Sequence, residues 1–311
     1  MQKKSPNNST MHDIMRRYMR YLRLERGYSQ NTIDAYGHDL GLLFAFLDDR
    51  QLSPLAVSLG DLEEFAASLH EHGLGAKTQS RVLFGIRSFY KYLVLDGFLD
   101  VNPTELLESP QLPRSLPEYL TTGEVDRLEA SVDLSTNEGH RNRAIIEVLF
   151  SCGLRVSELT NLKLSDLNLE ERFMRVVGKG NKERLVPISA DAIRELGFWF
   201  DDRRQMTIKP GEEDYVFLNR RGHRLTRTMI LIMIKRQALA AGISKTISPH
   251  TLRHSFATAM LRGGADLRVI QVLLGHSDIG TTEIYTHLDD ESLRREILEH
   301  HPRNMVGKTR G

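Results

Sequence analysis

Apolar residues recur at helical spacing through the first hundred residues of the chain. Ile14, Tyr18 and Leu22 lie four residues apart, which predicts a helix with one apolar face that ends before Gly27. Three further segments show the same period, one starting near Ser29 or Asn31, one ending by Gly73 and one starting near Ala76. Their apolar positions are Ile33, Tyr36, Leu40, Leu43 and Leu47; Leu62, Phe65, Ala66 and Leu69; and Val82, Ile86, Phe89 and Leu93. Four amphipathic helices with short connections predict a small helical bundle.

A cluster of prolines interrupts this helical pattern. Four of the ten prolines fall within fifteen residues, at Pro103, Pro110, Pro113 and Pro117. Each proline restricts its own backbone and that of the residue before it, so the stretch is unsuited to helix. We therefore predict an N-terminal domain over 11–103, a linker over 104–118, a second domain over 119–304 and a tail over 305–311.

The second domain contains both segments with helical spacing and segments typical of β-strands. Thr121 with Glu124 forms a capping-box pattern at the start of a helix. Residues 173–177 and 184–188 are rich in β-formers and flank the glycine-containing turn Gly178–Glu183, which predicts a hairpin. Further predicted elements are helices over 138–152, from Ser189, and over 227–241, 249–262, 266–274 and 279–287, with a short strand over 215–218. The expected fold is mainly α, with a small antiparallel sheet in an α+β second domain.

Composition narrows the class of protein. The 311 residues carry 42 Lys and Arg against 41 Asp and Glu, and this balance argues against a general polyanion binder but not against a local basic groove. The single cysteine, Cys152, excludes a disulfide scaffold and a cysteine-rich zinc module. No apolar run approaches the roughly 18 residues of a membrane span, and residues 1–10 have no apolar signal core. We expect a soluble, cytoplasmic protein.

The segment Pro249–His254 carries candidate chemistry. Proline favours a helix N-terminus here, and His250 and Arg253, three residues apart, share one helix face. An arginine and a histidine at a helix N-terminus suit a phosphate. A metal site of His250, His254 and His276 is a weaker alternative, because Thr251 stands where a zinc protease motif needs glutamate. Histidines that only cap and pack are a further alternative.

Three other short segments add polar groups of the same kind. Arg155 follows the helix-ending Gly153 and precedes Glu158, which could orient its guanidinium. Lys179 lies in the glycine-flanked turn, and Tyr285 follows His276 by nine residues. Taken singly, each has an ordinary explanation as a solvated charge or a packing residue.

The order of the six residues is more specific than any one of them. Arginine, lysine, His-x-x-Arg, histidine and tyrosine, in that order, resemble the tyrosine recombinase (phage integrase) family, and the flanking segments resemble its Xer-type members. The resemblance covers nearly the whole chain except residues 1–10 and 305–311, with no departure at the six positions. It implies a SAM-like helical core-binding domain followed by a catalytic domain.

The resemblance also implies a mechanism. Tyr285 would be the nucleophile that forms a 3′-phosphotyrosine with DNA, and Lys179 would protonate the leaving 5′-oxygen. His250 would assist proton transfer at the tyrosine. Arg155, Arg253 and His276 would stabilise the transition state. No metal and no cofactor is implied, because the phosphotyrosine retains the bond energy.

Partners follow from the same resemblance. Double-stranded DNA would be clamped between the two domains, with Lys77, Arg81 and Arg87 as candidate DNA contacts, although a solvated helix face explains them nearly as well. Four protomers, with or without a second type of recombinase, would assemble on two DNA sites, each placing its last helix (289–300) on a neighbour through Leu293, Ile297 and Leu298. The alternative is that this helix packs on its own domain. A DNA translocase is a possible activator.

The expected role is site-specific recombination that resolves chromosome dimers at cell division. The alternatives are a mobile-element integrase, a type IB topoisomerase, and a DNA-binding accessory protein without catalysis.

Overall fold

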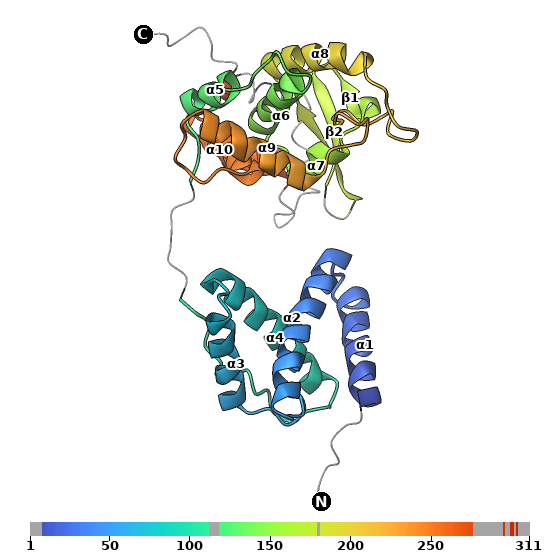
Figure 1. The fold of residues 1–311 in the computed structure, drawn as a ribbon, viewed down its shortest axis with the longest axis vertical. Helices are drawn as coiled ribbons and strands as arrows, with labels where there is room; N and C mark the ends of the chain where they lie inside the picture. Colours follow the sequence, from blue (N-terminus) through green and yellow to red (C-terminus); the bar gives the residue numbers. More distant parts are fainter. Residues whose placement is uncertain are drawn as a thin grey trace, which may run out of the picture. The chain divides into compact units, whose positions relative to one another are not determined.

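The chain forms two units, each with its own apolar core. The computed structural model describes residues 8–111, 118–178, 181–275, 295, 299–301 and 303, with side chains from residue 13 onward. Internal contacts divide the chain into Met1–Ser115 and Leu116–Gly311. Figure 1 shows both units, with labels on many of their elements.

The first unit is a bundle of four helices, with α2 packed on α1 and α4, and α3 packed on α4 (Figure 1). Side-chain caps start two of them: Ser29 accepts a hydrogen bond from Thr32 N at α2, and Ser58 forms a capping box with Asp61 at α3. Apart from the half-buried Ala66, every apolar position predicted for these helices is buried. The helices are α1 (Asn8–Leu24), α2 (Gln30–Asp49), α3 (Leu59–Glu71) and α4 (Ala76–Leu95).

The segment after α4 still packs on the first unit. Leu107 is buried in its core, and Arg87 of α4 donates hydrogen bonds to Leu107 O and to Ser109 Oγ, the latter at 2.8 Å. Ser80 Oγ donates to Pro110 O at 3.4 Å. The first part of the predicted 104–118 linker is therefore attached to the helical bundle.

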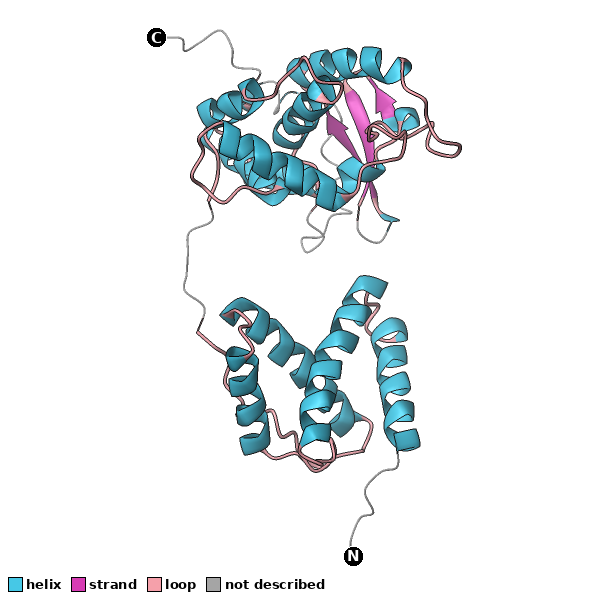
Figure 2. Cartoon of the chain, viewed as in Figure 1, coloured by secondary structure: helices cyan, strands magenta, loops and turns pink. Residues whose placement is uncertain are grey.

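The second unit is built around helix α6. Its residues from Ala144 to Ser151 are all buried, and α5, α8 and α10 pack against it. Figure 2 shows the strands gathered at one side of a unit that is otherwise helical. The helices are α5 (Thr122–Ala130), α6 (Gly139–Ser151), α7 (Val156–Asn161), a short 3₁₀ turn η1 (Leu164–Asp166), α8 (Ala190–Arg204), α9 (Arg227–Ala240), α10 (Pro249–Arg262) and α11 (Leu267–Leu274).

The sheet is antiparallel, in the order β1 (Leu167–Asn168), β2 (Phe173–Val177) and β3 (Glu183–Pro187). In the β2–β3 hairpin Met174 pairs with Val186 and Val176 with Arg184, and these four residues are buried. This confirms a mainly helical fold with one small antiparallel sheet among the described residues.

One predicted element is not formed, and another lies outside the described residues. The predicted strand 215–218 is wrong: Tyr215 and Leu218 form only isolated bridges, to Lys163 and Arg224, because Val216 N donates to the irregular segment at Leu162 O rather than to a strand. The predicted helix 279–287 lies outside the described residues.

Cys152 is buried at the end of α6, and burial raises the pKa of its thiol to about 12, so it stays protonated. No helix in the described part of the chain has the length and apolar character needed to cross a membrane.

Candidate active site

The turn between α6 and α7 positions the first candidate, Arg155. Gly153 has φ +61°, a conformation that favours glycine, and an added Cβ would lie 2.5 Å from the Phe256 ring. Arg155 follows at the N-cap position of α7. Glu158 accepts hydrogen bonds from Arg155 N at 2.8 Å and from Arg155 Nη1 at 2.7 Å. The carboxylate three residues ahead therefore orients the guanidinium, as the sequence indicated.

Glu158 also binds a second arginine, from the sheet. Arg184 Nη1 and Nη2 donate to its two carboxylate oxygens, each at 2.9 Å, and both side chains are buried. Burial alone would raise the pKa of Glu158, but the hydrogen bonds and charge of Arg184, followed by those of Arg155, lower it below its ordinary value. Glu158 is therefore ionised at neutral pH.

Arg253 on α10 completes the cluster. Its Nη1 donates to Gly153 O at 2.7 Å and lies 3.9 Å from Glu158 Oε2, and its Nη2 donates to Leu274 O. Burial, and then the neighbouring charge of Arg155, lowers the pKa of Arg253 to about 10, so it remains cationic at neutral pH. One carboxylate thus faces three guanidiniums.

The same three arginines bind the end of helix α11. The last carbonyl groups of a helix have no partner within it and carry partial negative charge, so they favour cations. Gly275 ends the helix with φ +64°. Each arginine donates to a successive carbonyl: Arg184 to Leu273 at 2.9 Å, Arg253 to Leu274, and Arg155 to Gly275 at 2.9 Å.

Two of the remaining predicted site residues lie on the surface of α10, and the other three are not described. His250 and His254 are exposed on α10, and the His254 ring lies edge-on to Tyr119. Lys179, His276 and Tyr285 lie outside the described residues.

The residues directly before Lys179 and His276 nevertheless lie beside the arginines that surround Glu158. An added Cβ at Gly178, directly before Lys179, would lie 3.6 Å from both Arg184 Nη1 and Glu158 Oε1. Gly275, directly before His276, accepts its hydrogen bond from Arg155.

Two family models match the chain. The phage integrase family matches residues 118–292, and the N-terminal SAM-like domain of phage integrases matches residues 15–97. The chain belongs to the phage integrase family of tyrosine recombinases.

Its relatives are similar over their whole length. The tyrosine recombinase XerD of Staphylococcus saprophyticus is 40% identical over 294 residues, which cover 94% of this chain and 100% of the relative. XerD of Staphylococcus aureus strain Mu50 is 39% identical with the same coverage. A XerH site-specific recombinase, solved as a pre-cleavage complex with its difH substrate, is 26% identical, with a TM-score of 0.64 over 94% of this chain and 84% of that one. This chain is a site-specific tyrosine recombinase of the Xer type, similar to XerD.

Arg184 of the recombinase was not among the site residues that the sequence predicted. The signal was present, because Arg184 and Val186 are two residues apart on one strand and therefore share the face that points to the core. A buried arginine needs a carboxylate partner. The sequence did not indicate that Glu158 is that partner as well as the partner of Arg155.

The candidate DNA contacts on α4 of the recombinase lie in different settings. Arg81 Nη1 pairs with Asp39 at 2.7 Å, and Arg87 binds the segment after α4 as described above. Lys77 is exposed, and no described residue forms an ion pair with it.

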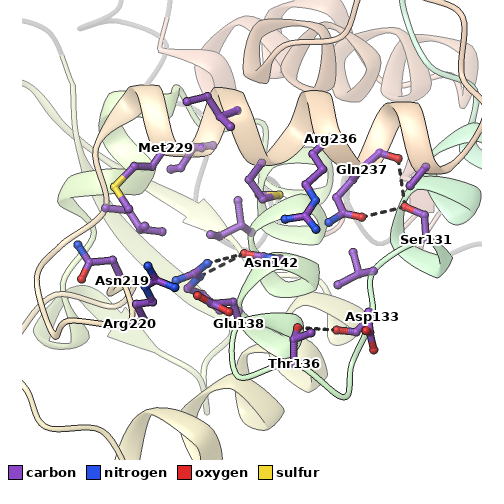
Figure 3. Close-up of a pocket in the computed structure, with 18 residues that line it drawn as sticks. Ser131, Asp133, Thr136, Glu138, Asn142, Asn219, Arg220, Met229, Arg236 and Gln237 are labelled. Atoms are coloured by element: carbon purple, nitrogen blue, oxygen red, sulfur yellow. Dashed lines mark hydrogen bonds between the residues drawn. The ribbon is translucent and has the colours of Figure 1, made fainter.

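A cavity of about 680 Å³ opens elsewhere in the catalytic unit of the recombinase, between α9, the start of α6 and the loop after α5 (Figure 3). In Figure 3, Arg236 and Gln237 extend from α9, with Asn142 and Glu138 opposite. The cavity lining does not include Arg155, Arg184 or Arg253. Among the described residues, no group of three or more His, Cys, Asp or Glu side chains could hold a metal ion.

Proposed function

We propose that this recombinase cleaves and rejoins double-stranded DNA at a chromosomal site and thereby resolves chromosome dimers at cell division. The similarity to XerD proteins along the whole length of those relatives supports the biological role. The recombinase would act in the cytoplasm, without ATP, metal or other cofactor.

The observation that supports the chemistry is the imbalance of charge around Glu158. Three guanidiniums share one carboxylate, which leaves two positive charges in a largely buried cluster. Arg155 remains 30% exposed, so a bound group can reach it. An oxygen-rich anion such as a phosphodiester suits this site, because planar guanidiniums donate paired hydrogen bonds to phosphate oxygens.

In the first step Tyr285 Oη attacks the scissile phosphorus. The new P–O bond forms to the tyrosine as the P–O5′ bond breaks, and Lys179 transfers a proton to the leaving 5′-oxygen. His250 assists removal of the phenol proton. In the second step a 5′-hydroxyl from the partner duplex attacks the phosphotyrosine, so that the DNA bond is restored and Tyr285 is released.

Charge develops on the non-bridging oxygens in both steps. Arg155 and Arg253, with His276, would stabilise that charge in the transition state. Their positions are set before DNA binds, because Arg155 and Arg253 already have fixed acceptors in Glu158 and the end of α11.

The assembly would contain four protomers on two DNA sites. Part of the tetramer would be a XerC-like partner recombinase, and a DNA translocase is the proposed activator. Residues 289–300, which would dock on a neighbouring protomer, lie mostly outside the described residues, and the described His300 at their end contacts Gly263 of its own unit.

A nicked suicide substrate that carries a candidate dimer-resolution site tests the cleavage step. The wild type should form a covalent adduct through a 3′-phosphate in the presence of EDTA, and Tyr285→Phe should form none. Tyr215→Phe is the matched control, because Tyr215 is a half-buried tyrosine of the same unit that contacts Arg224 rather than the arginine cluster. An adduct in Tyr285→Phe would refute the nucleophile, and loss of the adduct in EDTA would revive a metal role for His250, His254 and His276.

A second assay separates the related activities. Recombination between two sites on one plasmid, with relaxation of the same plasmid as a parallel reaction, distinguishes a recombinase from a type IB topoisomerase. Relaxation without exchange of partners would contradict the proposal. Exchange only at mobile-element ends would assign the chain to an integrase role.

A further inference from the structure

The last described residues of the chain are bound to their own catalytic unit. The backbone of His300 passes so close to Gly263, between α10 and α11, that an added Cβ there would overlap the His300 carbonyl. His300 Nδ1 is 2.7 Å from Gly263 O. This close approach requires a glycine at the end of α10.

Arg303 occupies an acidic socket formed by Asp126, Glu129 and Glu147. It donates to Asp126 on α5 and to Glu129 Oε2 at 2.9 Å, and its Nε lies 2.9 Å from Glu147 Oε2 on α6. Burial, and then the charge of Glu147, raises the pKa of Glu129 to about 9. Glu129 is therefore protonated at neutral pH beside the buried Glu147, and Arg303 is the cation that pairs with Glu147. Loss of Arg303 would leave the buried Glu147 without this partner, which is costly, so the socket holds Arg303 in place.

His301 lies completely buried between two aromatic rings. Its ring centroid is 5.5 Å from that of Phe150 and 5.6 Å from that of Phe256. Burial, and then the charge of Arg303, lowers the pKa of His301 to about 3, so the ring is uncharged at neutral pH. It therefore packs as a flat aromatic group.

Phe256 connects this ring to the candidate active site. It lies on α10 three residues after Arg253, and its ring packs on Gly153 so closely that no Cβ fits between them. Gly153 O in turn accepts the hydrogen bond from Arg253 Nη1, and Arg155 follows two residues later. Contacts thus run without a break from the chain end to both catalytic arginines.

We propose that His301 is a positioning residue for the recombination reaction: its ring supports Phe256 against Gly153 and so fixes the turn that orients Arg155 and Arg253. The proposal rests on the proposed catalytic role of these arginines. Removal of the ring would let Phe256 move away from Gly153 and would loosen the turn, with no direct contact between His301 and DNA.

Hydrogen exchange of the free protein tests the structural part without DNA. In His301→Ala, amides of residues 151–157 should exchange about tenfold faster than in the wild type at a temperature well below unfolding, because a looser turn opens more often. His301→Phe should restore slow exchange, since it returns a flat ring to the slot. Phe217→Ala is the matched control, a buried aromatic residue of the same unit outside these contacts. Equal exchange in His301→Ala and Phe217→Ala would overturn the proposal.

Cleavage of the suicide substrate tests the functional part. His301→Ala should lower the rate of adduct formation at saturating DNA by about tenfold or more, with an unchanged dissociation constant for DNA. A neutral methylphosphonate at the scissile position needs no arginine to balance its charge, so there the rates of the variant and the wild type should converge. A defect that persists on the methylphosphonate would overturn a role through the arginines.

Phe256→Leu covers the case in which His301→Ala does not fold. This variant leaves His301 and Arg303 in place and removes only the flat ring that contacts Gly153. It should therefore reproduce both the faster exchange of residues 151–157 and the slower adduct formation. Slow exchange together with full cleavage would overturn the proposal. Absence of an adduct in the wild type would refute the proposed function instead, while the exchange experiment would still decide the coupling.

Discussion

At the scale of single residues, Glu158 carries the largest number of roles. It caps α7 through Arg155 N, orients the Arg155 guanidinium, and neutralises the buried Arg184. A carboxylate that accepts this many charged hydrogen bonds keeps its ionised form. The arginines owe their positions to it, although it would make no contact with the scissile phosphate in the proposed reaction.

Glu158→Gln should destabilise the catalytic unit by about 3 kcal/mol or more, because it leaves Arg184 buried without a charged partner. Urea unfolding measures the loss. Asp201→Asn serves as control, since it breaks an ion pair with Arg204 in which both side chains are more than half exposed, and it should cost less than about 1 kcal/mol. Equal stability of Glu158→Gln and the wild type would contradict the central role of Glu158.

In Glu158→Gln we also expect a change in how the free energy of unfolding depends on pH. The folded pKa of Glu158 lies below its ordinary value of 4.5, so its stabilising contribution is present above pH 4.5 and disappears as the pH falls through the folded pKa. Stability measured across this acid range should therefore fall less steeply in Glu158→Gln than in the wild type. Parallel curves would show that Glu158 is not the group responsible.

At the scale of elements, helix α4 shows that charges on one helix can have different roles. Arg81 neutralises Asp39, whose side chain has no exposed surface and whose pKa is raised by burial. Arg87 holds the segment after the helix, whereas Lys77 is exposed. Lys77 is therefore the candidate DNA contact whose effect on DNA binding can be separated from stability.

Lys77→Ala should weaken DNA binding with little change in stability, and should reduce the slope of log affinity against log salt concentration by about one. Arg81→Ala should instead lower the free energy of unfolding by about 1–3 kcal/mol, because Asp39 loses its partner. Binding titrations at several salt concentrations and urea unfolding of both variants separate the two roles. A salt slope unchanged by Lys77→Ala would remove it as a phosphate contact.

At the scale of the whole molecule, the chain has two units with separate apolar cores. The apolar clusters of the bundle and of the catalytic unit contain no common residue. The near-neutral total charge conceals a concentrated positive charge around Glu158, which matters by its position rather than by its share of the total.

A fragment of residues 8–111 should therefore fold alone. We expect the same helix content per residue as in the full chain and one cooperative unfolding transition, because the fragment includes the complete core of the bundle and the segment up to Pro110 that packs on it. Circular dichroism during thermal unfolding is the measurement. A fragment that ends at residue 103 is the comparison and should be less stable, since it lacks the buried Leu107; equal stability would show that this segment contributes nothing.

The sequence was sufficient for features that depend on near neighbours in the chain. The helix periods of the first unit, the capping box at Thr121 and the β2–β3 strand pairing are local, and each was found where it was predicted. The order of the six candidate residues was sufficient to identify the family, because a motif is itself a property of the sequence.

Features that depend on contacts between distant segments emerged from the fold. Arg184 meets Glu158 across 26 positions and Leu273 across 89, and local periodicity contains no information about such partners. For the same reason the sequence did not show that Arg81 binds Asp39 or that segment 215–218 forms isolated bridges. It also did not show that His301 packs on Phe256, since those contacts form only when the chain closes around a common core.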